Sequence, residues 1–223
     1  MTPDLPTPEL PTPDQLDALA AAFDTLGKLH RQAPDSAALA AFRRLQAEWP
    51  LPGTPDAAAG MAALDRSARA DETAEQITAD HDRLYGDSAN AIVPPYESVH
   101  RGSEGLLFDT QTIEVRAAYR EFGLRAPRLN REPDDHLGLE FDFVGQLLLA
   151  ALDAMDAGDA DGAARALAGV RRFWREHLQP WAPDVLRRIA AAAGTQFMAG
   201  VALLSLGALE SLQMPLDKCE ESR

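Results

Sequence analysis

Apolar residues recur every three or four positions along most of the chain, which is the spacing of one face of an α-helix. The first such stripe contains Leu16, Leu19, Phe23 and Leu26. The same spacing returns in six later segments, at residues 35–49, 57–85, 110–122, 133–155, 159–178 and 182–212. No segment alternates β-branched and polar residues as a half-buried strand would. The pattern therefore predicts an all-α fold, a single-domain helical bundle.

Residues that begin and end helices support these boundaries. Asp35, and either Asp109 or Thr110, are suited to capping helix N-termini, and Gly86 and Gly123 to ending helices. Pro133 fits the first position of the helix that follows it. That helix is apolar on two faces, so we expect it to be buried at the centre of the bundle.

Three segments fall outside the helical pattern. Residues 1–13 repeat Leu-Pro-Thr-Pro and predict an extended, proline-rich arm. Residues 87–109 contain two prolines and two glycines without a sustained period, so we expect a long loop there. Its apolar content argues against disorder, and ordered loops of this length are usually functional. The helical domain is expected to span residues 14–214, and residues 215–223 to form a polar tail.

Composition and charge narrow the function. The chain has 223 residues, 46% of them hydrophobic, and a net charge of -14. This charge repels nucleic acid phosphates and anionic lipids and favours a basic partner such as a cationic peptide. The single cysteine, Cys219, has no partner for an intramolecular disulfide. The chain shows no export signal and no apolar run that could span a bilayer, so we expect a cytoplasmic protein without stable membrane insertion.

The most polar cluster is Asp134-Asp135-His136, with Glu140 one turn further on. Carboxylates in a first helical turn accept hydrogen bonds from unpaired N–H groups, which is a purely structural explanation. The alternative is a metal-dependent hydrolase that uses Asp134, Asp135, His136 and Glu140. No His-Glu-x-x-His pattern, phosphate-binding loop, dinucleotide fingerprint or nucleophile elbow accompanies them. The residues therefore predict no cofactor, no metal and no catalytic activity.

Three motifs in a fixed order resemble one known family. They are Pro-Pro-Tyr-Glu-Ser-Val at Pro94 to Val99, Glu-Pro-Asp-Asp-His-Leu-Gly-Leu-Glu at Glu132 to Glu140, and His-Leu-x-x-Trp-x-Pro at His177 to Pro183. A long Ala-rich closing helix follows. Together they resemble the TorD/DmsD family of redox-enzyme maturation chaperones, relatives of the nitrate reductase delta-type assembly proteins. The similarity covers residues 82–212, and nothing is carried over to the divergent region before Asp82.

The resemblance implies an all-helical chaperone of the TorD-like type that is not an enzyme. It would bind the twin-arginine leader and the apoprotein of a molybdoenzyme catalytic subunit, such as a dimethyl sulfoxide or trimethylamine oxide reductase. By holding them until the cofactor is inserted, it would assist insertion and delay export. The leader-binding positions that it implies are Leu84, Pro95, Tyr96, Asp135 and His136.

The chemistry of the leader agrees with this assignment. Its paired guanidinium groups need carboxylates beside an apolar groove, and Glu97 and Asp134 can add to those that Asp135 supplies. We expect the groove to lie between the 94–108 loop and the start of the Asp134 helix. A third hypothesis is a helical adaptor that binds a folded partner rather than a leader.

Overall fold

The computed structural model describes residues 11–86, 91–102, 105, 107–127 and 132–217, and ten α-helices lie within these ranges. The helices are α1 (Pro13–Arg31), α2 (Ser36–Leu45), α3 (Pro55–Arg69), α4 (Ala74–Tyr85), α5 (Glu97–Arg101), α6 (Thr110–Glu121), α7 (Leu137–Asp156), α8 (Ala160–Phe173), α9 (Ala182–Ala192) and α10 (Gln196–Asp217). A 3-10 turn (Gln46–Glu48) follows α2, and a π-helical turn (Trp174–Leu178) follows α8.

The all-α prediction is confirmed, since the described ranges contain helices and a single isolated β-bridge but no strand. Residues 1–10 of the predicted arm and Cys219 in the predicted tail lie outside these ranges. Within the same ranges, no helix has both the length and the apolar content needed to cross a bilayer.

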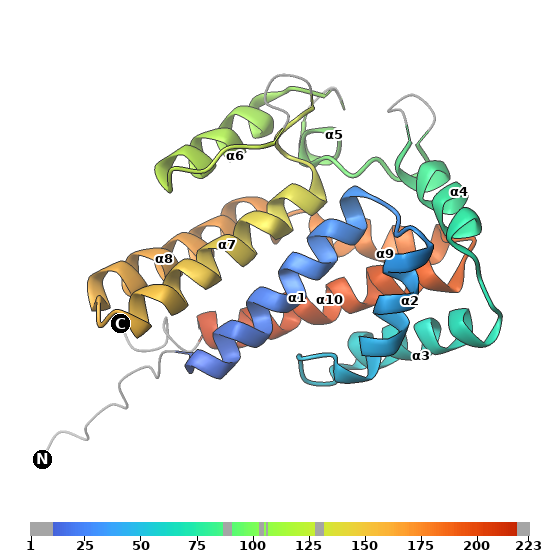
Figure 1. Ribbon diagram of the computed structural model, residues 1–223. Helices are drawn as coiled ribbons and strands as arrows, with labels where there is room; N and C mark the ends of the chain where they lie inside the picture. The colour runs from blue at the N-terminus through green and yellow to red at the C-terminus, as the bar shows by residue number, and fades with distance from the viewer. Residues whose placement is uncertain (1–10, 87–90, 103–104, 106, 128–131, 218–223) are drawn as a thin grey trace, which may run out of the picture.

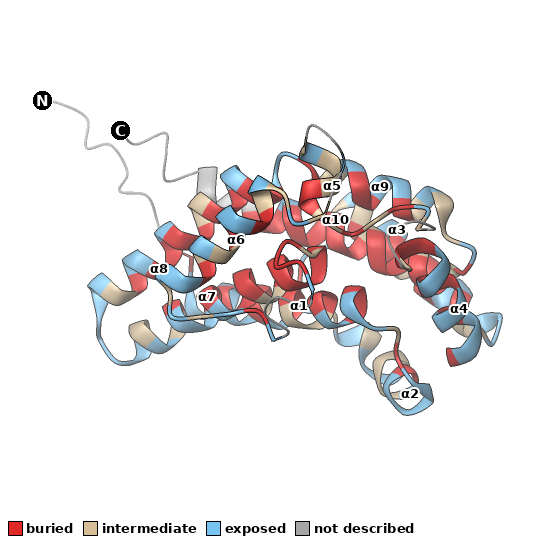
Figure 2. Cartoon of the chain, turned by 90° about the horizontal axis from the view of Figure 1, so that it is seen from above, coloured by how far each residue is buried: buried red, intermediate tan, exposed pale blue. Residues whose placement is uncertain are grey.

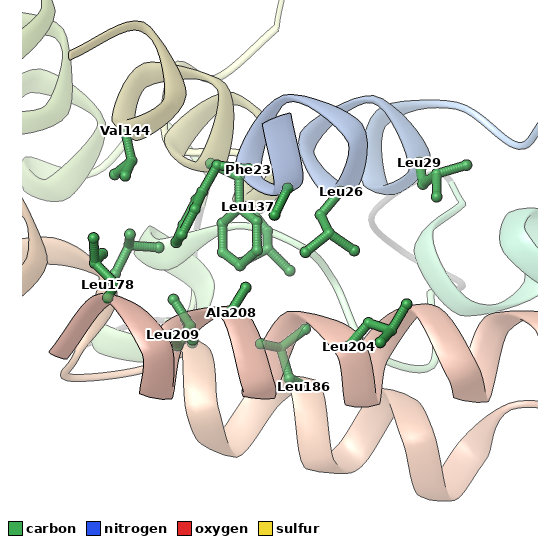
Figure 3. Packing of buried hydrophobic residues seen from close by; sticks show 14 of the residues in the cluster. Phe23, Leu26, Leu29, Leu137, Val144, Leu178, Leu186, Leu204, Ala208 and Leu209 are labelled. Atoms are coloured by element: carbon green, nitrogen blue, oxygen red, sulfur yellow. The ribbon is translucent and has the colours of Figure 1, made fainter. Parts of the chain in front are cut away.

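Three long helices, α1, α7 and α10, form the centre of the bundle (Figure 1). Helix α7 packs between α1 and α8, and α10 packs against α1, α3 and α9. Figure 3 shows Leu26 of α1 facing Leu204 and Ala208 of α10 across the core. The buried residues lie mainly along these inner faces (Figure 2). The predicted burial of the 133–155 helix is confirmed, since most of the first half of α7 is inaccessible.

Glycines allow the central helices to approach closely. A Cβ on Gly138 of α7 would lie 2.5 Å from the carbonyl oxygen of Gly27 in α1, and one on Gly27 would lie 2.9 Å from the carbonyl oxygen of Gly138. Helices α3 and α10 meet in the same way at Gly60 and Gly200. Real Cβ atoms are essentially never found within 3.0 Å of a backbone oxygen, so the contact between Gly27 and Gly138 requires glycine at both positions.

The chain expected to form one closing helix, residues 182–212, is instead divided into α9 and α10, so that prediction is wrong. The break falls at Ala193, Gly194 and Thr195. Asp80 of α4 accepts hydrogen bonds from the backbone N–H groups of Gly194 (2.9 Å) and Thr195 (2.8 Å). Glu72 accepts in the same way from Gln196 and Phe197. Carboxylates from a distant part of the chain therefore cap α10.

Two further predictions are corrected. Helix α7 begins at Leu137, not near Pro133, so Asp134 and Asp135 precede the helix rather than forming its first turn. The segment 87–109 is not wholly irregular, because α5 forms within it. The capping assignments of Asp35 and Asp109 are confirmed, as are the helix ends at Gly86 and Gly123.

Candidate functional site

An antiparallel bridge between Tyr96 and His136 joins two segments that are 40 positions apart in the sequence. The Glu97 N–H donates to the Asp135 carbonyl (3.0 Å), and the Leu137 N–H donates to the Pro95 carbonyl (2.8 Å). The rings of Tyr96 and His136 meet edge to face, with centroids 5.2 Å apart and planes at 84°. The structure therefore brings together the two motifs that the sequence singled out.

Asp135 stabilises the beginnings of two other helices. One carboxylate oxygen accepts from the Ser98 N–H in the first turn of α5 (2.7 Å), and the other accepts from the Thr112 hydroxyl in the first turn of α6 (2.6 Å). Its side chain is fully buried. A carboxylate at these positions satisfies an unpaired helix N–H and interacts favourably with the helix dipoles.

Asp134 also makes its contacts within the protein. Its carboxylate pairs with the Arg116 guanidinium of α6, and its backbone carbonyl accepts from the Tyr119 hydroxyl (3.1 Å). The second carboxylate oxygen, Oδ1, has no hydrogen-bond partner in the described part of the chain. Asp134 and Asp135 together hold α5 and α6 against the start of α7.

Glu97 lies at the start of α5 and is fully buried. It pairs with Arg101 of the same helix, and His177 in the π-helical turn approaches it through Nδ1 at 3.0 Å. Arg101 also donates to the Glu176 carbonyl (2.7 Å). Helix α5 is thereby fixed to the end of α8, and π-helical turns often occur at functional sites.

Glu140 lies one turn into α7, where the Trp181 indole N–H approaches it at 3.4 Å. Burial raises the pKa of Glu140 well above its usual value, and the negative charges of Glu97 and Asp135 raise it further. The carboxyl group is therefore protonated over a range of pH in which an exposed glutamate is ionised.

The pH dependence of stability tests the raised pKa of Glu140. Because unfolding lets Glu140 ionise at its usual pKa, the protein loses stability as pH rises above about 4.5 towards the raised folded value. Glu140→Gln removes this loss. We expect the variant to unfold at a higher denaturant concentration than the wild type at pH 8, with a difference that shrinks as pH falls to about 4.5. A difference that stayed constant with pH would contradict the raised pKa.

The burial of Glu97, Asp134 and Asp135 corrects one prediction. We expected these carboxylates to lie open to the guanidinium groups of an incoming chain, but all three are fully buried. The reason is that each already has partners inside the protein. Asp135 binds the starts of α5 and α6, Asp134 pairs with Arg116, and Glu97 pairs with Arg101 and His177. They position the site and do not face solvent. Leu84 and Pro95 are buried as well.

Tyr96 and His136 are the two predicted positions that remain partly accessible. The Nδ1 atom of His136 accepts from the Gly138 N–H (3.0 Å), which makes His136 the N-cap of α7. Partial burial lowers the pKa of His136 to about 3, with further contributions from the charges of His81 and Arg31. The imidazole is therefore neutral near pH 7.

Two accessible carboxylates that sequence reasoning missed lie beside Arg31 and His81, the two residues whose charges act on His136. Asp142 of α7 faces Arg31 of α1 across 3.8 Å, and both side chains are about one-third exposed. Asp82 of α4 is mostly exposed and lies 3.7 Å from His81. Asp142 carried a recognisable signal, since it lies between Phe141 and Phe143 in the apolar stretch "FDFVGQLL". We refer to Tyr96, His136, Arg31, Asp82 and Asp142 as the leader surface.

The hydrolase set is not assembled as a metal site. Asp135 contacts α5 and α6, Asp134 contacts Arg116, and Glu140 approaches Trp181, so the carboxylates serve different partners. In the described ranges, no group of three or more His, Cys, Asp or Glu side chains is arranged to hold a metal ion.

The accessible part of the site is an aromatic ring beside a neutral imidazole. The chain belongs to the nitrate reductase delta subunit family, whose model matches residues 53–187. This match begins before Asp82, so family similarity extends into α3 and the first part of α4, to which the resemblance carried nothing over.

Named relatives agree with the TorD/DmsD resemblance. The chain is 28% identical to the Tat proofreading chaperone DmsD of Salmonella typhi over 91% of its own length and 92% of the relative. It is 27% identical to the chaperone protein TorD of Photobacterium profundum, but this match spans only 48% of the chain and 49% of the relative. Because these relatives are chaperones and not enzymes, the hydrolase alternative is set aside.

Proposed function

We propose that this protein is a maturation chaperone that binds the twin-arginine leader of a molybdoenzyme catalytic subunit. The observation that carries the proposal is the Tyr96–His136 pair, which is fixed by a β-bridge yet partly accessible. The name of the DmsD relative, a Tat proofreading chaperone, supports the same role. In this proposal the chaperone also holds the apoprotein until the cofactor is inserted, and so acts in the cytoplasm before export.

The leader surface matches the chemistry of a twin-arginine leader. Guanidinium groups pair most strongly with carboxylates at about 2.7–2.9 Å. The Arg31–Asp142 separation of 3.8 Å is longer than that, so Asp142 can accept a stronger partner. Asp82 offers a second exposed carboxylate. We propose that the leader's arginines pair with Asp142 and Asp82, and that the net charge of -14 favours their approach.

The apolar part of the leader requires a different surface. Ile92, in the segment that leads to Tyr96, is 46% exposed. With the Tyr96 ring it offers apolar area beside the carboxylates, as a receptor for a charged and then apolar peptide requires. In this proposal the buried predicted residues do not contact the leader but fix the backbone that carries Tyr96 and His136. These residues are Leu84, Pro95, Glu97, Asp134 and Asp135.

Substitutions at the accessible pair test the proposal. His136→Asn keeps a side chain that caps α7 but removes the imidazole, and Tyr96→Leu keeps apolar bulk but removes the aromatic ring. We expect each to weaken binding of dimethyl sulfoxide and trimethylamine oxide reductase leader peptides by about tenfold, equivalent to about 1.4 kcal/mol, in titration calorimetry. Leu149→Ala, at an exposed position of α7 outside the leader surface, is the control. Wild-type affinity in both site variants would refute the assignment.

Two further binding comparisons distinguish leader recognition from the adaptor hypothesis. A leader in which both arginines are replaced by lysine keeps the charge but loses the bidentate geometry, so we expect weaker binding. A client protein without its leader should bind more weakly than the intact client. Equal binding of the two clients would favour the adaptor hypothesis instead.

A further inference from the structure

One segment of this acidic protein carries the opposite charge. Residues 116–131 contain five arginines and a single acidic residue, Glu121, which gives the segment a net charge of +4 in a chain of net charge -14. The described part of this segment comprises most of α6 and the connection that follows it, as far as residue 127. It lies on the outer side of the bundle, along α7 and α8 (Figure 1).

A cavity of about 240 Å³ opens between the C-terminal half of α6 and this connection. Arg116, Arg120 and Arg125 line it, together with Asp134 and the Tyr119 ring. Ligand sites for larger organic molecules usually occupy about 300–1,000 Å³. The cavity is therefore suited to one small charged group, and a complete nucleotide would exceed it.

The charge within the cavity is positive. Asp134 is the one acidic residue in the cavity lining, and Arg116 already pairs with it. Arg120 and Arg125 are exposed and make no ion pair with a described residue. Arg120 lies in the last turn of α6, where a cation stabilises the helix dipole, but Arg125 lies beyond the helix and has no such role. The guanidinium groups of Arg120 and Arg125 are thus available to bind a ligand.

We propose that this cavity binds a phosphate group. A phosphate dianion presents several acceptor oxygens in different directions, and guanidinium groups from both walls of the cavity can each donate to it in their fork geometry. A single carboxylate would offer fewer acceptors to the same arginines. The ligand class is a small phosphorylated compound or a phosphate group carried by a larger partner.

Titration calorimetry at constant ionic strength tests the proposal, with inorganic phosphate and pyrophosphate as ligands and acetate for comparison. We expect saturable one-site binding of phosphate or pyrophosphate to the wild type, and weaker binding of acetate. The double variant Arg120→Gln/Arg125→Gln should weaken binding by about tenfold or more, since each charge-assisted hydrogen bond contributes substantially. The matched control, Arg69→Gln/Arg187→Gln, removes the same charge from exposed positions on α3 and α9 and should bind as the wild type does.

Three results would overturn the proposal. One is the absence of saturation for both phosphate and pyrophosphate up to about 10 mM. Another is an equal loss of affinity in the site and control variants, which would indicate a general charge effect. The third is equally tight binding of acetate, which would contradict the assignment to phosphate. Because none of the leader-surface residues lines the cavity, leader binding by the same variants reports separately on the proposed function.

Discussion

Replacement of Gly138 by alanine should lower the free energy of unfolding by about 2 kcal/mol or more, although alanine is normally the better helix former. The new Cβ would lie 2.5 Å from the Gly27 carbonyl oxygen and 2.7 Å from Arg31 Cγ. Alanine gains about 1 kcal/mol of helix propensity, whereas overpacking against a backbone atom costs about 3 kcal/mol or more. The clash outweighs the gain in helix propensity, because the Gly27 backbone cannot move without separating α1 from α7. The net change in the free energy of unfolding is therefore a loss.

Chemical denaturation followed by circular dichroism measures this effect. Gly27→Ala should act in the same direction, since its Cβ would meet the Gly138 carbonyl oxygen at 2.9 Å. Gly53→Ala is the matched control, because nothing lies within 4 Å of its Cβ and its stability should change by less than about 0.5 kcal/mol. A Gly138→Ala variant as stable as the wild type would show that α1 and α7 are not in backbone contact.

Asp135→Ala should lower the free energy of unfolding by about 3 kcal/mol and weaken leader binding as a consequence. The substitution leaves the Ser98 N–H and the Thr112 hydroxyl without their partner in a fully buried environment. Each unsatisfied buried group costs about 1–3 kcal/mol. The ends of α5 and α6 then lose their anchor to the segment before α7, and the Tyr96–His136 bridge loses its support.

Asp135→Asn separates this structural role from a direct contact with arginine. The amide oxygen still accepts from Ser98, and the Thr112 hydroxyl can rotate to accept from the amide nitrogen. We expect a smaller stability loss than in Asp135→Ala and leader affinity close to that of the wild type at a temperature where the variant is folded. A fully stable Asp135→Asn that had lost leader binding would instead indicate that Asp135 contacts the leader directly.

Most helix boundaries could be predicted from the sequence because they depend on local interactions. The Asp35 side chain caps α2 through the Ala38 N–H, three positions away, and Asp109 caps α6 through Thr110. The Gly123 backbone has φ of 73°, which favours glycine and ends α6. Signals of this kind lie within one turn of the residue they affect.

The boundaries that were missed depend on residues far away in the sequence. The break before α10 has no proline, and the caps that stabilise it come from Asp80 and Glu72, more than 110 positions earlier. Likewise, Asp134 and Asp135 had the composition of a first helical turn. They instead lie in a turn, and the bridge to Pro95 and Glu97 holds His136 extended, so α7 begins only at Leu137.

The distinction between local and long-range interactions also explains which features of the site could be predicted. The motifs at Pro94 to Val99 and Glu132 to Glu140 were associated correctly through the family resemblance, and the structure brings them together. The orientation of the acids could not be predicted, because it depends on Ser98, Thr112 and Arg116 from other helices. The carboxylates of Glu97, Asp134 and Asp135, which we expected to bind arginine, are buried and have partners inside the protein. The accessible carboxylate of Asp142 was not predicted.

Hydrogen–deuterium exchange with and without a twin-arginine leader peptide shows which part of the chain the leader contacts. We expect bound leader to slow exchange at residues 91–101 and 132–142, where Tyr96, His136 and Asp142 lie, and to leave α3 unchanged. The twin-lysine peptide at the same concentration should give weaker protection. Protection confined to other helices, or none at a saturating leader concentration, would contradict the claim that this surface receives the leader.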